Sequence, residues 1–504
     1  MKSMILIVIL APIIGGLFLW IRPVRDTHRR NVLVMTLCML VSAAALILLG
    51  TYAASGMLSS GGELLTVLQI YGKDFTLAFH MDGLSAVFTA IVAVLWPVTD
   101  LYAFEYMQHD HAQNRFFAFF TMTYGVVLGI ALSANLFTLY LFYELLTLCT
   151  LPLVMHEMDG AAKHAGLKYL LYSMSGAALA FVSMMILSGS GDLAFTPGGS
   201  LSAILSAGKE TLLGIGFLLG FFGFGVKAAI FPFHGWLPSA GVAPTPVTAL
   251  LHAVAVVNAG IFAVFRLLYY GYGAEFLSGT FAQNVMMAVS AFTVVYGSLM
   301  ALRMQHLKRR LAYSTVSNLS YMLLGAAMCS GAGIAAAILH MIVHSALKIA
   351  LFFCAGALLC RTEEMSCGVQ EYVFQYTGYG KKTPVIFTVF TIASLGLIGI
   401  PPLSGFASKW TIAQAAAEQG SALAWTGCAA LAVSAFLTGM YLLGVILEAC
   451  FPPVGFRNPD LEELKDPGMR MKSALAVVAA IGVVLIACIP YLQTVLNAYA
   501  GGLI

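Results

Sequence analysis

About fourteen runs of apolar residues recur along this 504-residue chain, and each is long enough to cross a bilayer core, which needs ~20 residues per helix. The runs cover residues 4–21, 32–50, 83–104, 115–132, 135–155, 167–189, 211–231, 245–270, 282–302, 310–329, 332–358, 383–407, 423–449 and 473–496. Charged residues make up only 9% of the chain, too few to cover a water-facing surface. We therefore expect an all-α polytopic membrane protein with about fourteen transmembrane helices. Soluble enzymes, secreted disulfide scaffolds and nucleic-acid binders are excluded.

Basic residues give the expected orientation of these helices. Of the 25 Lys and Arg residues, 18 lie in loops after odd-numbered runs and three lie on the opposite side. Because basic loops stay on the inner side, both termini are expected outside, with the chain in the cell inner (cytoplasmic) membrane. The first run lacks an A-x-A cleavage pattern and ends in a basic stretch, so it is expected to be a retained span. About eight residues follow the last run, which predicts no long lateral helix after it.

The nine cysteines are scattered, form no CxxC pair and lie mostly in apolar runs. A thiol in such a run behaves as a small hydrophobic group. Neither a zinc nor an iron–sulfur ligand set is visible in the sequence. We therefore expect no cofactor, no metal and no redox centre in this chain.

Two ionisable residues stand inside apolar runs in the first half of the chain. Glu144 lies in the fifth run, and Lys227 lies late in the seventh, just before Phe-Pro-Phe and Trp-Leu-Pro. An ionised group at mid-membrane costs at least ~2.5–3.5 kcal/mol and usually marks a transport pathway. We interpret Glu144 as a proton-carrying carboxylate and Lys227 as a functional lysine beside a helix break. The simpler alternatives are a carboxyl satisfied by a neighbouring helix and a lysine that extends to the membrane interface.

The eleventh run carries three titratable residues on one helix face. His340, His344 and Lys348 are spaced four residues apart, and each step of four advances an α-helix by little more than one turn. Together they extend over ~12 Å, nearly half of a bilayer core. This stripe predicts a proton pathway along the helix. The HxxxH spacing also resembles a zinc pair, but no third ligand stands near it in the sequence.

Two runs contain helix breaks beside a lysine. The seventh run breaks around Pro232 near Lys227, and the twelfth breaks around Pro401 near Lys409. Irregular backbone at membrane depth is tolerated only where it is buried in protein or lines a wet cavity, so we expect Lys409 to be hydrated and able to lose its proton. The two breaks are five spans apart, and this odd offset predicts inverted repeats, an architecture found in many ion transporters.

Seven segments, in this order along the chain, resemble the antiporter-like membrane subunits shared by respiratory complex I, multisubunit cation/proton antiporters and membrane-bound hydrogenases. They are HMDGLSAVF at 80–88, NLFTLYLFYELLTL at 135–148, KAAIFPFHGWLP at 227–238, APTPVTALLHAV at 243–254, LKRRLAYSTVSNLSYMLLG at 307–325, HMIVHSALK at 340–348 and GIPPLSGFASKW at 399–410. Together these segments cover roughly residues 80 to 415.

The resemblance implies a fourteen-span fold with two inverted five-helix repeats, broken at helices 7 and 12. The expected division is 1–110 for helices 1–3, 111–271 for a first half-channel with helices 4–8, 272–450 for a second half-channel with helices 9–13, and 451–504 for the C-terminal loop and helix 14. The resemblance also assigns six titratable residues to the proton pathway. They are the input pair Glu144 and Lys227, the central residues His340, His344 and Lys348, and the output lysine Lys409.

The sequence departs from the family in the eighth span, where members often have a lysine and this chain has Asn258. Asparagine can hydrogen-bond water but cannot titrate, so Asn258 is expected either to join a water chain or to be a polar helix contact. His252, in the same span, could substitute for the missing lysine. His234 follows the break of the seventh span and is either a gating residue or a cap of the broken helix. Arg266 is expected to anchor at the lipid headgroups.

The expected function is that of a proton-translocating subunit in a larger redox-driven complex, either complex I-like or membrane hydrogenase-like. Its expected partners are other membrane subunits, including antiporter-like paralogues and a redox module, together with protons and the lipid bilayer. A partner helix is expected to pack on the small residues 176–178 of the sixth span.

Two alternatives stay open: a cation/proton antiporter subunit, and a non-conducting structural paralogue that scaffolds such a complex. Asn258 motivates the scaffold alternative, because it interrupts the titratable relay, but four charged residues inside the membrane disfavour it. Sodium would require oxygen ligands, and Glu144 is the one clear mid-membrane carboxylate in the sequence. Sodium transport is therefore disfavoured.

Overall fold

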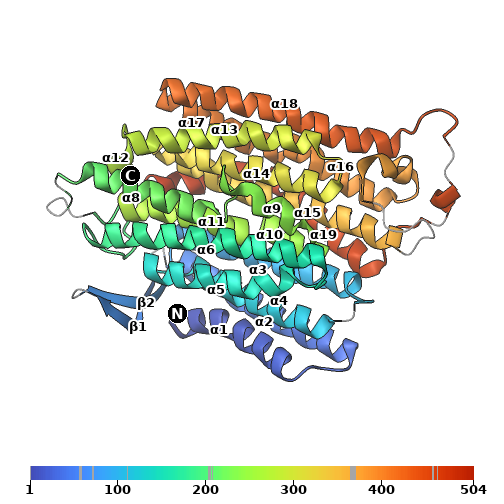
Figure 1. The fold of residues 1–504 in the computed structure, drawn as a ribbon, viewed down its shortest axis with the longest axis horizontal. Coiled ribbons are helices and arrows are strands. Elements are labelled where there is room, and N and C mark those ends of the chain that lie inside the picture. The colour runs from blue at the N-terminus through green and yellow to red at the C-terminus, as the bar shows by residue number, and fades with distance from the viewer. Residues whose placement is uncertain are drawn as a thin grey trace.

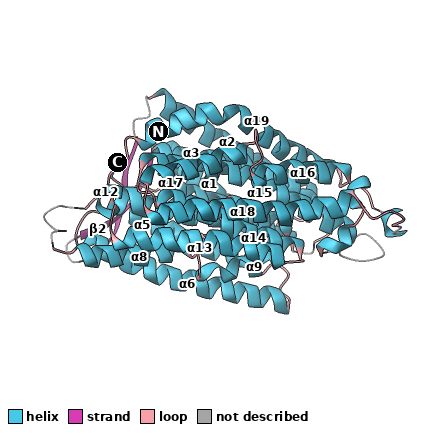
Figure 2. Cartoon of the chain, turned by 90° about the horizontal axis from the view of Figure 1, so that it is seen from above, coloured by secondary structure: helices cyan, strands magenta, loops and turns pink. Residues whose placement is uncertain are grey.

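The computed structural model describes residues 2–55, 60–70, 73–110, 112–201, 206, 208–363, 371–456, 459–462 and 464–503. Its helices run side by side as one bundle, with α1 and α2 at one edge and α18 at the other (Figure 1). Seen from above, the same helices cross the body roughly parallel to one another, and the strands lie at one end (Figure 2).

The α-helices make up almost all of the regular structure. Their bounds are α1 Lys2–Ile21, α2 Thr27–Ala54, α3 Gly83–Tyr106, α4 Gln113–Ala131, α5 Leu136–Val154, α6 Gly160–Ser188, α8 Glu210–Gly225, α9 Trp236–Ser239, α10 Thr245–Ala253, α11 Val256–Arg266, α12 Ala274–Leu277, α13 Phe281–Arg303, α14 Leu307–Ala326, α15 Gly331–Glu363, α16 Pro384–Ile398, α17 Ser404–Gln419, α18 Ala422–Cys450 and α19 Met469–Ala500. A π-helix, Leu267–Tyr272, continues α11. Short 3-10 helices cover Phe233–Gly235, Ala240–Val242, Val373–Tyr376, Tyr379–Lys381 and Pro459–Glu462.

Helix starts follow local sequence signals. Several helices begin after a residue whose side-chain oxygen accepts a hydrogen bond from a main-chain N–H of the first turn, a contact that stabilises a helix end by about 1 kcal/mol. These N-cap residues are Asp26, Asp82, Asn135, Asp159, Thr280 and Ser421. The polar residues that separate the apolar runs therefore also fix where the spans begin.

The all-α class is confirmed, with one addition that the sequence analysis did not include. Strands β1, Ser60–Ile70, and β2, Lys73–Met81, pair antiparallel in a two-stranded hairpin. The hairpin leads into α3 and is tied to the bundle where the main-chain N–H of Ala78 donates to Thr138 Oγ1 at 2.9 Å. It lies at the end of the bundle where both chain ends are drawn (Figure 1).

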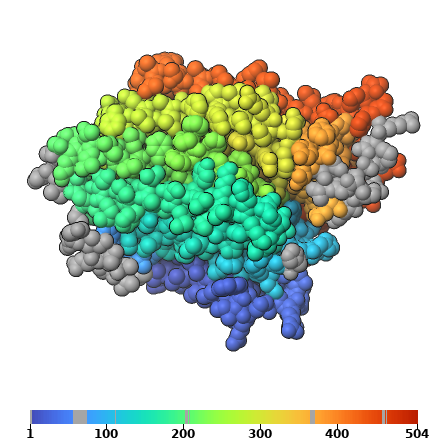
Figure 3. All heavy atoms as spheres, in the orientation of Figure 1, coloured from blue at the N-terminus to red at the C-terminus, as the bar shows by residue number. Residues whose placement is uncertain are grey.

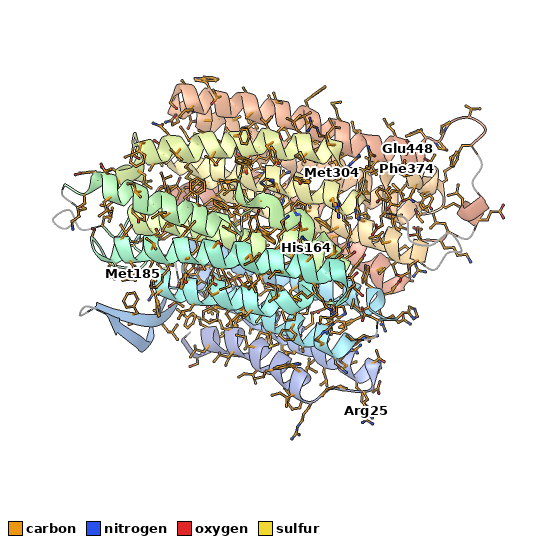
Figure 4. All side chains as sticks on the ribbon, in the orientation of Figure 1. Arg25, His164, Met185, Met304, Phe374 and Glu448 are labelled. Atoms are coloured by element: carbon orange, nitrogen blue, oxygen red, sulfur yellow. The ribbon has the colours of Figure 1, made fainter. Side chains whose placement is uncertain are left out.

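Within the described residues, eleven helices are long and apolar enough to cross a membrane. The other three predicted runs correspond to α8, to the more polar α14, and to α16 followed by α17. The predicted count of fourteen spans and the inverted repeats stay predictions. Arg25 and Glu448 lie toward one end of the helices and Met185 toward the other (Figure 4), so the loop after α1 and the end of α18 share a face.

The most buried spans are also the ones that carry polar residues. The segment α10–α11 with its π-helical continuation, Thr245–Tyr272, is buried along its whole length, and α15 is buried along nearly all of it. Helix α15 packs against α10, α14, α16, α17 and α19, so it lies at the centre of the molecule. In contrast, only about a third or fewer of the residues of α1, α2 and α19 are buried, and α1 and α2 form the blue edge of the body in Figure 3. The polar residues therefore lie in the interior, away from lipid.

Both predicted helix breaks are present, and a third was missed. Helix α8 ends at Gly225 and is followed by a turn in which Ala229 has φ 53°, a left-handed conformation that is rare outside glycine. Helix α16 ends at Gly399 with φ 88°, and α17 begins at Ser404. The third break separates α10 from α11 after Ala253, inside the run that was predicted to be one continuous span.

Candidate proton-translocating site

The first part of the site lies where α8 breaks against α5. Lys227 is fully buried, so it does not extend to the membrane interface. Its Nζ lies 3.9 Å from Glu144 Oε1 and donates to the main-chain oxygen of Tyr143 at 2.7 Å. The same Nζ lies 3.2 Å from the centre of the Tyr143 ring, where the negative face of an aromatic ring stabilises a cation. The predicted pair of Glu144 and Lys227 therefore exists in the folded chain.

Two contacts hold this break in shape. The Tyr143 hydroxyl donates at 2.9 Å to the main-chain oxygen of Phe224, which lies at the end of α8 where the helical ladder stops. Helix α11 approaches the break through Gly260, where an added Cβ would lie 2.5 Å from the main-chain nitrogen of Ala228 and 3.1 Å from Lys227 Cβ. Glycine is therefore needed for α11 to reach the lysine.

The second part of the site lies at the break between α16 and α17. Lys409 Nζ donates to the main-chain oxygens of Leu397 at 2.7 Å and Ile398 at 3.2 Å. In an unbroken helix these oxygens would accept from residues 401 and 402, but both are prolines and have no N–H. The Pro-Pro pair therefore creates the binding site for the lysine. Among the described residues, no carboxylate pairs with Lys409.

The stripe on α15 lies between these two parts, at the centre of the bundle. His340, His344 and Lys348 are all essentially fully buried. His340 Nδ1 is hydrogen-bonded to Ser408 Oγ at 2.9 Å, one residue before Lys409. The rings of His340 and His344 are 6.3 Å apart, and Lys348 Nζ donates to the main-chain oxygen of Leu311 at 3.0 Å. The predicted helical stripe is thus confirmed as a shared buried face that reaches the second break.

Asn258 links the first break to this stripe. Its Nδ2 donates to the main-chain oxygen of Ala253 at 2.9 Å and to Ser345 Oγ at 2.8 Å. Ala253 ends α10, so Asn258 satisfies a carbonyl that the third break leaves free, and Ser345 follows His344 on α15. Asn258 Oδ1 is buried without a hydrogen-bond partner among the described residues. Both expected roles, a polar helix contact and a place in a water chain, therefore stay open.

His252 and Lys308 extend the central group toward the basic face. His252 is fully buried and stacks obliquely on Phe352 with ring centres 4.7 Å apart. It interacts electrostatically with Lys348 and Lys308. Lys308 was counted as a loop charge in the sequence, yet it is buried and donates to the main-chain oxygen of Ala243 at 3.0 Å. The burial of Lys308 could not be predicted from the sequence, because Lys308 stands next to two other basic residues in the chain. It depends on how the residue packs against α10 in the folded protein.

His234 lies just after the first break and is only 8% exposed. Its ring contacts the rings of Phe231, Tyr296 and Tyr313, with centres 5.8, 4.9 and 6.3 Å away. His234 Nδ1 has no partner among the described residues. The ring is thus enclosed by aromatic groups at the surface end of the break, and its predicted gating role stays a prediction.

The expectation for Arg266 was wrong. The side chain is fully buried and forms a double hydrogen bond with Asp82, at 2.5 and 2.8 Å, and a third bond to Ser85 Oγ at 2.8 Å. Burial by itself would raise the pKa of Asp82, but the Arg266 guanidinium outweighs it and holds that pKa well below its usual range. Arg266 therefore ties α11 to the start of α3 and does not anchor at headgroups.

Two further sequence expectations need correction. Asp100 in α3 is a second buried carboxylate, only 1% exposed, so Glu144 is not the one acid inside the spans. It contacts Cys38 of α2, and its Oδ1 has no hydrogen-bond partner among the described residues. In α6, Gly176 packs internally, because an added Cβ would lie 2.7 Å from the main-chain oxygen of Gly223 in α8. Gly176 and Ala177 are thus covered by the chain itself, and of the three small residues only Ala178 is exposed to a partner helix.

Possible metal ligands gather elsewhere than on the HxxxH pair. In the described residues, one group of three potential ligand atoms lies within 4.8 Å of one another, from Asp110, His156 and Glu157. His156 Nε2 and Asp110 Oδ2 are hydrogen-bonded to each other at 3.1 Å. His340 and His344 are not in this group. The predicted absence of a metal and of a cofactor stays a prediction.

The fold and these contacts define a class: a polytopic membrane protein whose buried lysines and histidines gather at broken helices, as in ion-translocating membrane proteins. Residues 133–438 match the family model described as NADH:quinone oxidoreductase/Mrp antiporter, TM. Residues 68–117 match a second model, described as the N-terminus of chain 5 of NADH-ubiquinone oxidoreductase (complex I). The chain belongs to the NADH:quinone oxidoreductase/Mrp antiporter family, as its motifs predicted.

Curated relatives carry names from the same group of complexes. The NADH-quinone oxidoreductase subunit N of Desulforudis audaxviator is 30% identical over 436 residues, which cover 86% of this chain and 82% of that protein. The NAD(P)H-quinone oxidoreductase chain 5 of a Picosynechococcus species is 32% identical over 381 residues, which cover 73% of this chain and 56% of that protein. The chain therefore spans little more than half the length of the chain 5 relative.

Two solved structures share the fold. A chain of the membrane-bound sulfane sulfur reductase, an archaeal respiratory membrane complex, matches with a TM-score of 0.82 and 21% identity, covering 99% of this chain and 97% of that one. A chain of the Mrp complex from a Dietzia species matches with a TM-score of 0.80 and 21% identity, covering 100% and 97%. At this identity the likeness concerns the fold alone.

Proposed function

We propose that this chain is the proton-translocating membrane subunit of a larger redox-driven complex, moving protons along Glu144, Lys227, the central histidines, Lys348 and Lys409. The observation that carries the proposal is how the buried lysines are held. Lys227, Lys348 and Lys409 each donate to a main-chain oxygen inside the bundle. A carbonyl accepts a hydrogen bond from a charged ammonium and from a neutral amine alike, so each lysine can lose its proton and keep its contact.

The histidines support the same role. Both ring nitrogens of His252 and of His344, and Nε2 of His340, are buried without a hydrogen-bond partner among the described residues. Buried polar atoms in native proteins are usually satisfied by protein or by ordered water. Water molecules between these rings would satisfy the nitrogens and connect the lysines. Asn258, bonded to Ser345 beside His344, would then join the water chain without itself titrating.

The division into two half-channels and the membrane orientation are parts of this proposal. Residues 111–271 would form the half-channel around Lys227, and residues 272–450 the one around Lys409. The basic loops favour the inner membrane of the cell, with both termini on the outer side. The relatives named above are subunits of quinone oxidoreductases, which favours a redox module and antiporter-like paralogues as partners.

A cation/proton antiporter subunit is the second candidate. The observation that favours it is Asp100, because a second buried carboxylate supplies the oxygen ligands that a sodium ion would need. Asp100 and Glu144 lie on different helices, α3 and α5, and only Glu144 has a lysine beside it. The two candidates are separated by comparing proton uptake driven by a sodium gradient with proton uptake driven by electron transfer in the same vesicles.

The decisive experiment measures proton uptake in inside-out vesicles that carry the native complex, with Lys227→Ala and Lys409→Ala compared with the unsubstituted protein. Lys163→Ala is the matched control, because Lys163 is an exposed lysine on α6. Complex assembly and electron transfer are measured in the same preparations. We expect assembly to persist and uptake to fall sharply in the two buried-lysine variants. Unchanged uptake in assembled complexes would leave a scaffold as the function of the chain.

A further inference from the structure

A cavity of about 670 Å³ lies at the end of the bundle where α2 and α19 begin and α3 and α15 end. Its lining includes His28 at the start of α2, Arg361 at the end of α15 and Arg470 at the start of α19. Arg25, which stands two residues before α2, marks this end of the helices in Figure 4. The cavity therefore lies on the side of the basic loops, which is the proposed inner side of the membrane.

The charges that line this polar cavity do not cancel. Among the described residues of the lining, Glu105 is the single acid. Its Oε1 accepts from the main-chain N–H of Gly468 at 2.6 Å, its Oε2 accepts from that of Met471 at 3.1 Å, and Arg361 Nη2 lies 3.6 Å from Oε1. The carboxylate thus fixes the start of α19 to the end of α3. Arg470 is exposed, so two arginines against one carboxylate leave the cavity positively charged.

A second cavity, of about 320 Å³, lies deeper among α3, α15 and α19 and is apolar. Its lining consists mainly of aliphatic side chains from residues 87–95 of α3 and 481–492 of α19. Its one hydroxyl group among the described residues, that of Ser345, donates to the main-chain oxygen of Met341 at 2.7 Å and accepts from Asn258 at 2.8 Å. Because this hydroxyl is already paired, the space favours an apolar occupant over water.

A strip of apolar side chains on α3 joins the two cavities. Val94 lines the apolar cavity, and Pro97, Val98 and Leu101 follow it at spacings of three and four residues. Glu105 comes four residues later and lines the polar cavity. These spacings place all five residues on one face of the helix, and each of them is at least partly exposed. The strip is therefore the floor of a groove that runs from the polar cavity to the apolar one.

The length of the groove matches one leaflet of a bilayer. Leu95 and Phe104 are nine residues apart on α3, which is ~14 Å at a rise of ~1.5 Å per residue. Arg470 and Ile481 are eleven residues apart on α19, which is ~16 Å at the same rise. Half of the hydrocarbon core of a bilayer is ~15 Å. A head group in the polar cavity would thus place the end of an acyl chain in the apolar cavity.

We propose that this groove binds one anionic phospholipid of the inner leaflet, with its phosphate at Arg361 and Arg470 and one acyl chain over residues 94–101 into the apolar cavity. The planar N–H donors of arginine match phosphate oxygens, and basic pockets between transmembrane helices on the cytoplasmic side suit anionic head groups. A partner helix could fill the apolar cavity but would leave the positive charge without a counterpart. The bound chain would cover Ser345 from the membrane side. The proposal concerns binding alone and holds whether or not the chain moves protons.

The test measures lipid binding to the purified native complex after its lipids have been exchanged for detergent. The thermal midpoint is followed during titration with phosphatidylglycerol, with phosphatidylcholine of the same acyl chains and with glycerol 3-phosphate, and retained lipid is counted by mass spectrometry. Arg470→Gln and Val94→Trp alter the two ends of the groove. The matched controls are Arg25→Gln and Val483→Trp, which change exposed residues outside both cavities.

We expect phosphatidylglycerol to bind more tightly than phosphatidylcholine, and glycerol 3-phosphate to leave the midpoint unchanged. Arg470→Gln should weaken phosphatidylglycerol binding by about fivefold, the effect of one basic residue near an anionic lipid surface. Val94→Trp should remove one retained phosphatidylglycerol per complex, and both controls should bind like the unsubstituted protein. Equal binding of the two lipids, an equal loss in Arg25→Gln, or a midpoint shift by glycerol 3-phosphate would each overturn the lipid site. Cross-linking of Val94→Cys to another subunit in native membranes would assign the groove to a protein partner instead.

Discussion

The two helix breaks hold a lysine in similar ways but surround it with different charges. At the first break, Lys227 donates to a main-chain oxygen, faces the Tyr143 ring and lies 3.9 Å from Glu144. At the second break, Lys409 donates to two main-chain oxygens and lies 5.1 Å from the centre of the Tyr321 ring. No carboxylate of the described residues pairs with it.

This difference predicts that the two lysines hold their protons with different strength. A carboxylate within a few ångströms favours the charged form of a lysine, so Glu144 stabilises the proton on Lys227. Among the described residues, Lys409 Nζ is hydrogen-bonded to main-chain oxygens alone. At longer range it interacts electrostatically with Lys348 and His340, which also carry positive charge when protonated. A proton arriving on the central stripe would therefore favour loss of the proton from Lys409, whereas Glu144 would retain the one on Lys227.

The largest effect is expected where each break depends on a glycine. An added Cβ at Gly405 would overlap the main-chain oxygen of Gly396, and one at Gly260 would lie 2.5 Å from the main-chain nitrogen of Ala228. We expect Gly405→Ala to destabilise the protein more than Gly260→Ala, each by about 1–3 kcal/mol or more, as overpacked sites do. The thermal midpoint of the purified complex measures the order. Gly444→Ala is the control, because an added Cβ there meets nothing within 4 Å, and equal midpoints for all three variants would contradict the expectation.

A double-mutant cycle tests the charge difference between the breaks directly. We expect the effects of Glu144→Gln and Lys227→Met on the rate of proton uptake, expressed as free energies, to be non-additive by about 0.5–3 kcal/mol. Each substitution removes the partner of the other residue. The same cycle with Lys409→Met in place of Lys227→Met should be close to additive, because Glu144 and Lys409 share no contact among the described residues. Equal coupling in the two cycles would mean that the breaks are not electrically distinct.

The link between the breaks is expected to matter less than the lysines themselves. Asn258→Leu removes the hydrogen bonds to Ala253 and Ser345 and leaves both acceptors buried. We expect a loss of about 1–3 kcal/mol in stability, the typical effect of an unsatisfied buried polar group, and slower uptake. Ser345→Ala, which removes one of these two contacts, should give a smaller loss of both. Uptake at the native rate in Asn258→Leu would show that no water chain passes this residue.

The smallest effect is expected from the tyrosine hydroxyl at the first break. Tyr143→Phe keeps the ring beside Lys227 but removes the 2.9 Å hydrogen bond to the main-chain oxygen of Phe224. We expect a stability loss of about 1 kcal/mol, with most of the transport preserved. Tyr140→Phe, on the same helix, is the control. A transport loss as large as that of Lys227→Ala would show that the hydroxyl itself carries protons.

Much of the candidate site could be predicted from the sequence, because local patterns place residues on helix faces. The spacing of His340, His344 and Lys348 puts them on one helix face whatever the fold. The Pro401–Pro402 pair removes two consecutive N–H donors from a helix, whereas single prolines lie inside α1, α3, α5 and α19 without ending them. The break between α10 and α11 could not be predicted this way, because no proline or glycine stands at Val254 and Ala255. At this break Asn258 supplies a side-chain donor to the freed carbonyl of Ala253, a contact that the sequence pattern does not show.

The sequence by itself determined the membrane class, the family, the broken helices at Lys227 and Lys409, and the titratable stripe on α15. Hydropathy, proline chemistry and the helical period are properties of short segments, so they can be read from the chain. Only the tertiary structure decided that Arg266 pairs with Asp82, that Asp100 and Lys308 are buried, and that α15, α17 and α19 line a polar cavity. Those outcomes depend on which helices pack together, and burial and pairing of charges arise from contacts between residues that lie far apart in the chain.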